Sequence, residues 1–236
     1  MNITTTDQGD NYGKIILEEM ELSPDFANWG IEISSSGLNG KVIEIGCGLG
    51  RNLEFLKKHC TDLWGCDYRE EYISYVESNK YFMQGKTILW DISQPPKFQT
   101  EFDSFFCSNV IEHIEDDQKA ICNIARIPKI KGGVIIVPAL SHIYNRIDKN
   151  LSHYRRYDKK ELNQKLTNAG FKIVDIFSFN KIGTLGWIWQ GMIFKKDTLG
   201  KENMKIFNKL MPIIRKLDIF IPFPGLSLIA IIEKNK

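Results

Sequence analysis

The sequence predicts an α/β protein whose mainly parallel β-sheet is covered by helices on both faces. Between residues 41 and 139, short β-type runs alternate with helical stretches, which is the pattern of parallel strands joined by crossover helices. The run Val134–Val137 (VIIV) is continuously apolar, as expected of a strand buried on both sides. The 236 residues, 43% of them hydrophobic, are enough for one large core.

The first half of the chain supplies five expected strands and the helices between them. Lys41–Ile45 is β-branched and ends in glycines, and a helix is expected to follow it. Acidic residues at 116 and 117 suit the first turn of a later helix because of the helix dipole. Gly132 and Gly133 are expected to turn the chain into the fifth strand. In chain order after the first strand, we expect helix Leu49–Cys60, strand Asp62–Asp67, helix Glu70–Ser78, strands Thr87–Asp91 and Phe102–Ser108, helix Asp116–Arg126 and strand Val134–Ala139.

The second half contains two further strands separated by a long segment. A helix is expected at Asp158–Ala169, ended by Gly170, and Phe171–Phe179 then alternates as a strand does. The last strand is expected at Leu226–Ile232. About 45 residues between these strands are too many for a plain loop. We therefore predict a helical or lid insertion at 180–225, within a main domain at 39–236 that follows a helical cap at 1–38.

Charge is distributed unevenly along the chain. Residues 1–150 contain 15 Lys/Arg and 22 Asp/Glu, whereas residues 151–236 contain 16 and 7. This asymmetry suggests an anionic partner or substrate near the C-terminal third. Five cysteines without a C-x-x-C pair predict a reducing compartment. His59, Cys60 and Cys66 match no familiar metal-ligand spacing, so no metal is expected.

Hydropathy predicts a cytoplasmic protein. The start of the chain is polar, and no uncharged stretch reaches the ~18–20 residues that cross a bilayer. The segment 180–225 leaves three interpretations open: ordinary core, an apolar acceptor pocket, or peripheral contact with a membrane. Its large apolar residues include Trp187, Trp189, Met192, Phe194 and Phe207.

A glycine loop follows the first strand, at Gly46, Gly48 and Gly50. Such glycines let the backbone approach a ligand, but the G-x-G-x-G spacing differs from the dinucleotide fingerprint G-x-G-x-x-G. Asp67 ends the second strand, where an acid can accept hydrogen bonds from ribose hydroxyls; it could instead cap the next helix. Asp91, after the third strand, could face an adenine amine or open a turn.

The motifs VIEIGCGLGRN, GCDYRE, LWDIS and SFFCSNVIEHIEDD resemble, in this order, those of class I S-adenosylmethionine-dependent methyltransferases. The resemblance implies a Rossmann-like, mainly parallel seven-stranded sheet with an antiparallel strand at one edge. It also implies S-adenosylmethionine as the cofactor, with Gly46, Cys47 and Gly48 around its methionine part. The full set of expected cofactor residues adds Glu44, Asn52, Asp67 and Tyr68 (ribose), Asp91 and Ile92 (adenine), and Ser108, Asn109 and Val110. Glu44 could equally be an ion-paired core carboxylate.

Later segments resemble a bacterial subgroup of these enzymes that is often next to, or fused with, glycosyltransferases. They are NRIDKNLSHYRRYDKKEL, FNKIGTLGW and PFPGLSLIAIIEK. The resemblance implies a small-molecule, glycoconjugate or lipid-linked acceptor, methylated on oxygen or nitrogen. A nucleic-acid acceptor is disfavoured, because the Asn/Asp-Pro-Pro-aromatic motif of amino-methylating enzymes is absent at 108–111 and no RNA-binding module accompanies the domain.

Histidines and arginines near the strand ends are the candidates for chemistry. His113 and His153 are expected to accept a proton. Arg155 and Arg156 could clamp a phosphate or carboxylate of an anionic acceptor, with His142, Tyr144 and Tyr157 beside them. Alternatively, this cluster is scaffold that pairs with Asp148 and Asp158. Two other functions stay open: a non-catalytic S-adenosylmethionine-binding protein and, disfavoured by the glycine spacing, an NAD(P)-dependent oxidoreductase.

Overall fold

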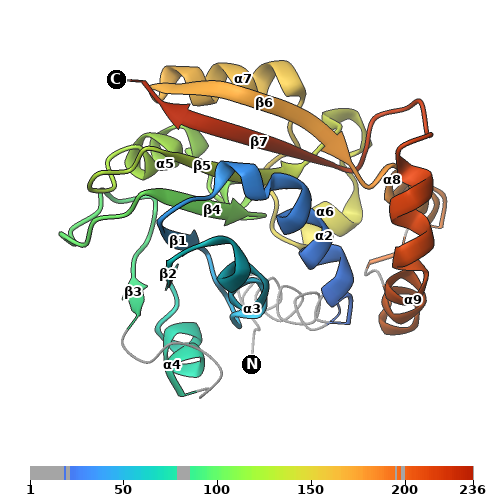
Figure 1. Cartoon of the computed structure of the whole chain (residues 1–236). Helices are drawn as coiled ribbons and strands as arrows, with labels where there is room; N and C mark the ends of the chain where they lie inside the picture. The colour runs from blue at the N-terminus through green and yellow to red at the C-terminus, as the bar shows by residue number, and fades with distance from the viewer. Residues whose placement is uncertain (1–18, 20–21, 79–85, 195, 198–199, 236) are drawn as a thin grey trace, which may run out of the picture.

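The computed structural model describes residue 19 and residues 22–78, 86–194, 196–197 and 200–235. Within them, seven strands form one sheet in the order β3-β2-β1-β4-β5-β7-β6 (Figure 1), as predicted. The strands are β1 Lys41–Ile45, β2 Asp62–Asp67, β3 Thr87–Leu89, β4 Ser104–Ser108, β5 Gly132–Pro138, β6 Phe171–Phe179 and β7 Ser227–Lys234.

We expected the antiparallel strand at one edge of the sheet. The structure places it one position in from the edge. β7 pairs antiparallel with both β5 and β6, and β6 forms the edge. The composition of the two strands explains this order. Residues 227–232 of β7 are all buried, so β7 needs a neighbour on each side. Only three of the nine residues of β6 are buried, which suits an edge strand.

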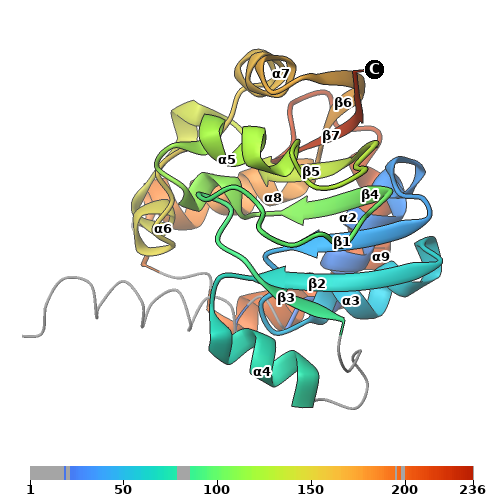
Figure 2. The same cartoon turned by 90° about the vertical axis from the view of Figure 1, so that its left-hand side faces the viewer.

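Helices cover both faces of the sheet (Figure 2). On one face, Ile121 and Leu162 of α5 and α7 pack with Phe105. On the other, Trp29, Leu53 and Met211 of α2, α3 and α9 form a second cluster. The helices are α2 Pro24–Ser34, α3 Arg51–Leu56, α4 Glu70–Ser78, α5 Asp117–Ile124, α6 Arg146–Asn150, α7 Lys159–Asn168, α8 Lys181–Trp187 and α9 Lys201–Asp218.

The expected turn at Gly132 and Gly133 is wrong, because both residues belong to β5. A Cβ on Gly132 would collide with the backbone of Ile232, and one on Gly133 with that of Phe105. These glycines therefore allow neighbouring strands to approach closely. The positive φ of 57° lies earlier in the loop, at Lys129.

The segment between β6 and β7 is helical. It contains α8, a π-helical segment at Ile188–Ile193 and α9. In the first 38 residues the structure shows α2, whereas residues 1–18 of the expected cap lie outside the described part. Within the part that is described, no helix combines the length and the apolar character needed to cross a membrane.

Candidate active site

A cavity of about 770 Å³ lies at the C-terminal ends of the parallel strands. Gly46, Asp67, Ser108 and Pro138 bring the ends of β1, β2, β4 and β5 to its wall. This is where open α/β sheets bind ligands, and the volume is within the ~300–1,000 Å³ typical of small-molecule sites. The opposite wall comes from α8, the π-helical segment and α9.

Two glycines of the loop after β1 have different surroundings. Gly46 has φ 72° and Gly48 has φ 52°, so both adopt a conformation that favours glycine. A Cβ on Gly46 would collide with the Val110 side chain, whereas a Cβ on Gly48 would meet nothing within 4 Å. Gly46 is therefore required by packing, while Gly48 leaves the cavity wall open to a ligand.

Asp67 fixes the loop to the end of β2. Its Oδ2 accepts a hydrogen bond from the Gly48 N–H at 3.0 Å, and its Oδ1 accepts one from the Arg69 N–H at 3.0 Å. Burial raises the pKa of this carboxyl, although these N–H groups oppose the shift. A carboxylate offers about four acceptor positions, so two bonds leave capacity for hydroxyl groups in the cavity.

Glu44 lies behind the loop and not on the described cavity wall. Its Oε1 accepts a hydrogen bond from Asn52 Nδ2 at 2.8 Å, and Asn52 does line the cavity. Burial raises the pKa of Glu44 to about 8. Among the described contacts, Glu44 reaches the cavity through Asn52, and its contact with the cofactor stays a prediction.

Asp91 opens a turn, as one of its two interpretations predicts, and its contact with an adenine stays a prediction. Its carboxylate accepts hydrogen bonds from the backbone N–H and the hydroxyl of Ser93, each at 2.8 Å, which is a turn-opening arrangement. Asp91 also lines the cavity. The other expected cofactor residues on the cavity wall are Gly46, Cys47, Gly48, Asn52, Asp67, Tyr68, Ile92, Ser108, Asn109 and Val110.

Two histidines meet at the wall near β4 and β5. The rings of His113 and His153 are T-shaped, with centroids 4.7 Å apart, and both line the cavity. His153 Nδ1 lies 3.0 Å from Asp148 Oδ1. Burial lowers the pKa of His153, although Asp148 opposes the shift. Burial and the neighbouring His153 lower the pKa of His113 to about 3. Both rings are therefore neutral near pH 7.

Glu112 completes this corner. It is fully buried, and neither carboxyl oxygen has a hydrogen-bond partner among the described residues. Its Oε1 lies 4.0 Å from His153 Nε2, and burial raises its pKa to about 8. One ligand atom each from Glu112, His113 and His153 lie within 4.8 Å of one another, so these three side chains could also hold a metal ion.

The structure does not bring both arginines of the predicted clamp to the cavity, because Arg156 lines it whereas Arg155 is not on its described wall. Arg155 pairs with Asp117 at 2.8 Å and donates to the Glu115 carbonyl. Arg156 donates to Asp148 Oδ1 and to the Ala139 carbonyl, each at 2.8 Å. Buried carboxylates such as Asp148 need this compensation.

The other expected acceptor residues lie away from the described cavity wall. His142 is exposed. Tyr144 donates its hydroxyl to the His153 carbonyl at 2.6 Å, and buried Tyr157 donates to Asp117 at 2.8 Å. The scaffold interpretation of this cluster is confirmed for Asp148, whereas Asp158 accepts from the Ser141 hydroxyl instead.

Comparison with known proteins agrees with this geometry. Residues 43–137 match the family model of a methyltransferase domain. The chain therefore contains a methyltransferase domain, within the fold of class I S-adenosylmethionine-dependent methyltransferases. A ubiquinone biosynthesis O-methyltransferase from Coxiella burnetii is 28% identical over 157 residues, which cover 59% of this methyltransferase and 67% of the relative. This classification sets aside the oxidoreductase alternative.

Solved structures show the same fold. An S-adenosylmethionine-dependent methyltransferase from Archaeoglobus fulgidus superposes with a TM-score of 0.57 at 19% identity, covering 90% of this methyltransferase and 95% of the other chain. One from Mesorhizobium loti gives a TM-score of 0.60 at 12% identity, with coverage of 88% and 98%.

The cavity fits the cofactor of this class. Eleven of the twelve expected cofactor residues reach one continuous wall, where Gly48 leaves space and Asp67 retains acceptor capacity. Their individual contacts with S-adenosylmethionine stay predictions.

The sequence alone did not identify the helical wall of the cavity as part of a site. Its members come from three parts of the chain and are mostly apolar. The sequence signal was the aromatic content of 180–225, which left several interpretations open. The wall residues most relevant to an acceptor are Phe26, Trp187, Gln190, Met204 and Phe207.

Proposed function

We propose that this methyltransferase methylates a hydroxyl oxygen of a small-molecule or lipid-linked acceptor, with His153 as the general base. The hydrogen bond between His153 and Asp148 at the cavity wall carries this proposal. A neutral imidazole held by a carboxylate is the arrangement that accepts a proton from a hydroxyl.

The position of Asp148 selects one tautomer of His153. Asp148 is buried, and its pKa is lowered by hydrogen bonds from His153 and Arg156 that outweigh the opposing effect of burial. An ionised Asp148 accepts from Nδ1–H, which places the free electron pair of the ring on Nε2. His113 packs against this ring, but its pKa of about 3 makes it a much weaker base.

S-adenosylmethionine supplies a methyl group on a positively charged sulfur. With this group bound, the acceptor oxygen would bond to the methyl carbon as the carbon–sulfur bond breaks, and the electron pair of the broken bond would stay on sulfur. His153 Nε2 takes the hydroxyl proton. Because a neutral amine attacks through its own electron pair and can lose its proton afterwards, a positioned base favours oxygen over nitrogen as the acceptor atom.

The helical wall favours an acceptor with an apolar part. Phe26, Trp187, Met204 and Phe207 border the cavity, while the guanidinium group of Arg156 is already paired. The Coxiella burnetii relative is named an O-methyltransferase, which supports a hydroxyl acceptor. Of the two arginines predicted to bind an anionic acceptor, Arg156 alone lines the described cavity, and its Nε and Nη1 already donate to Asp148 and to the Ala139 carbonyl.

The test is turnover with radiolabelled S-adenosylmethionine and a panel of phenols, hydroxylated sugars, lipid-linked sugars and matched amines. We expect product from hydroxyl acceptors. His153→Gln should reduce kcat roughly 10²–10⁴-fold without weakening S-adenosylhomocysteine binding, and exposed His142→Gln should do neither. Methylation of amines alone, or full turnover by His153→Gln, would contradict the proposal. Absence of turnover with a bound cofactor would favour the non-catalytic alternative.

A further inference from the structure

Helix α9 carries two apolar stripes on neighbouring faces. Met204, Met211 and Ile214 are buried against the rest of the molecule. The second stripe consists of Ile206, Leu210, Ile213 and Leu217, spaced four, three and four residues apart. Their exposed fractions are between 45% and 58%. The protein's own core therefore accounts for the first stripe only.

Exposed apolar side chains continue on both sides of this stripe along the chain. Ile219 and Phe220, just after α9, are 78% and 81% exposed. Before α9, the exposed rings of Trp189 and Phe194 are in edge-to-face contact, with their centroids 5.1 Å apart. Of the sixteen large hydrophobic residues that are exposed in the described structure, eleven lie between residues 185 and 220. Apolar surface concentrated in this way indicates an interaction site.

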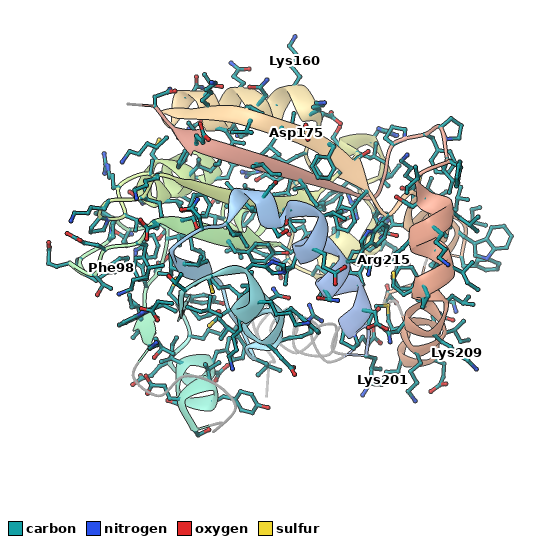
Figure 3. The ribbon with its side chains drawn as sticks, in the orientation of Figure 1. Phe98, Lys160, Asp175, Lys201, Lys209 and Arg215 are labelled. Carbon is teal, nitrogen blue, oxygen red and sulfur yellow. The ribbon has the colours of Figure 1, made fainter. Side chains whose placement is uncertain are left out.

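Lysines border the exposed stripe. With about 100° of rotation per residue, Lys205, Lys209 and Lys216 fall together along one side of it. Lys209 and Lys216 form no salt bridge with any residue that the structure describes. Figure 3 labels Lys209 on α9, at the outer side of the molecule. Residues 181–220 contain eight Lys/Arg and three Asp/Glu, a formal charge of +5.

We propose that this surface binds an anionic lipid bilayer, with α9 lying in the membrane interface. We call it the α9 face and define it by Ile206, Leu210, Ile213, Leu217 and Phe220 together with Lys205, Lys209 and Lys216. An apolar stripe with lysines alongside is the pattern of interfacial helices, in which apolar side chains enter the lipid and lysines contact headgroups.

A bilayer suits this face better than a second copy of the chain does. In a symmetric dimer the same patch meets itself, so the two sets of lysines would face each other and repel. Anionic headgroups neutralise these lysines instead. The arrangement also has a consequence for the cavity, because Met204 and Phe207 of the same helix line it. Docking on α9 would place the cavity about one helix diameter, ~10 Å, from the membrane surface.

The charge half of the proposal is tested by sedimenting the full-length protein with vesicles. We expect binding to mixed phosphatidylcholine–phosphatidylglycerol vesicles, weakened by salt, and little binding to phosphatidylcholine alone. The double variant Lys209→Glu/Lys216→Glu should bind roughly 30-fold more weakly or worse. The control Lys159→Glu/Lys160→Glu makes the same charge change on α7, where Figure 3 shows Lys160 on a different side of the molecule, and should bind nearly as the parent does.

The apolar half is tested by Ile213→Ser/Leu217→Ser, which we expect to weaken vesicle binding about tenfold or more. The control is Val174→Ser on β6, 53% exposed, which should leave binding unchanged. All variants should bind S-adenosylhomocysteine normally, because none of these side chains lines the described cavity wall. The proposal fails if the parent ignores anionic vesicles, if the serine variants bind as the parent does, or if the protein forms a dimer that the serine variants abolish.

Discussion

Gly46 and Gly48 stand two residues apart and both have a positive φ, yet substitution should affect them differently. Gly46→Ala should lower the free energy of unfolding by about 1–3 kcal/mol, because its Cβ collides with Val110. Gly48→Ala should cost only about 1 kcal/mol of backbone strain but should weaken S-adenosylhomocysteine binding at least about tenfold. Urea unfolding and calorimetry separate the two effects. Normal binding by Gly48→Ala would show that the cofactor does not approach this wall.

If His153 is the general base, turnover should depend on pH. The base must be unprotonated, so kcat should rise with pH through the pKa of His153 and then level off. Because burial lowers that pKa, the midpoint should be below the ordinary value of 6.5. A pH–rate profile with its midpoint above 6.5 would contradict this assignment.

A chelator distinguishes the base from a metal site. Turnover should persist in EDTA if His153 acts as a base. Loss of turnover that Mg²⁺ or Mn²⁺ restores would instead assign Glu112, His113 and His153 to a metal ion.

At the residue scale, the sequence predicted contacts between neighbours in the chain better than contacts across the fold. The cavity residues between Gly46 and Val110 could be predicted because each of their motifs is contiguous in the chain and lies at or near the end of a strand. The ion pair between Arg155 and Asp117 was not predicted because the two residues are 38 positions apart in the chain. Their contact depends on how α5 packs beside the loop before α7.

At the element scale, β1 contains a carboxyl that should make stability depend on pH. Burial raises the pKa of Glu44 from 4.5 to about 8 in the folded protein, so the folded state holds this proton more tightly than the unfolded state does. Its contribution to stability is complete below about pH 4.5 and is lost as pH rises through about 8, at up to ~1.4 kcal/mol per pH unit. Glu112 acts in the same direction.

Replacing this carboxyl with an amide should remove its share of the pH dependence. Glu44→Gln keeps the shape and cannot ionise, so its free energy of unfolding should fall less between about pH 5 and pH 8 than that of the parent. Glu54→Gln on the exposed face of α3 should leave the parent slope unchanged. Urea denaturation across this range measures both. Equal slopes for Glu44→Gln and the parent would mean that Glu44 is ionised in the folded state.

The strand boundaries show what local pattern can determine. β1, β2 and β6 begin and end at the predicted residues, since β-branched runs and alternation are local signals. The antiparallel position of β7 was misplaced because strand order depends on which partner buries each face. Gly132 and Gly133 were interpreted as a turn because the collision that requires glycine involves residues from β4 and β7, which are remote in the sequence.

At the scale of the whole molecule, the cavity joins two parts of the chain that carry different amounts of sequence signal. The strand ends from residue 45 to residue 110 contain recognisable motifs, so this wall was predicted. The helical wall from residue 187 to residue 207 consists mostly of apolar and amide side chains, which in sequence look like ordinary core. Only the packing of α8 and α9 over the strand ends gives them a role.

Because both walls border one cavity, ligand binding should stabilise the fold as a whole. S-adenosylhomocysteine at about 100 times its Kd should add ~2.7 kcal/mol, which for a chain of this size raises Tm by roughly 5–11 °C. Asp67→Ala removes the carboxylate beside Gly48 and should weaken binding roughly 10–150-fold, so at the same ligand concentration about half to nine tenths of this shift should disappear. Asp62→Ala, at the other end of β2, should retain the shift, and NADH should give none. An undiminished shift for Asp67→Ala would exclude Asp67 as a cofactor ligand, because the stabilisation would then arise from contacts elsewhere in the cavity.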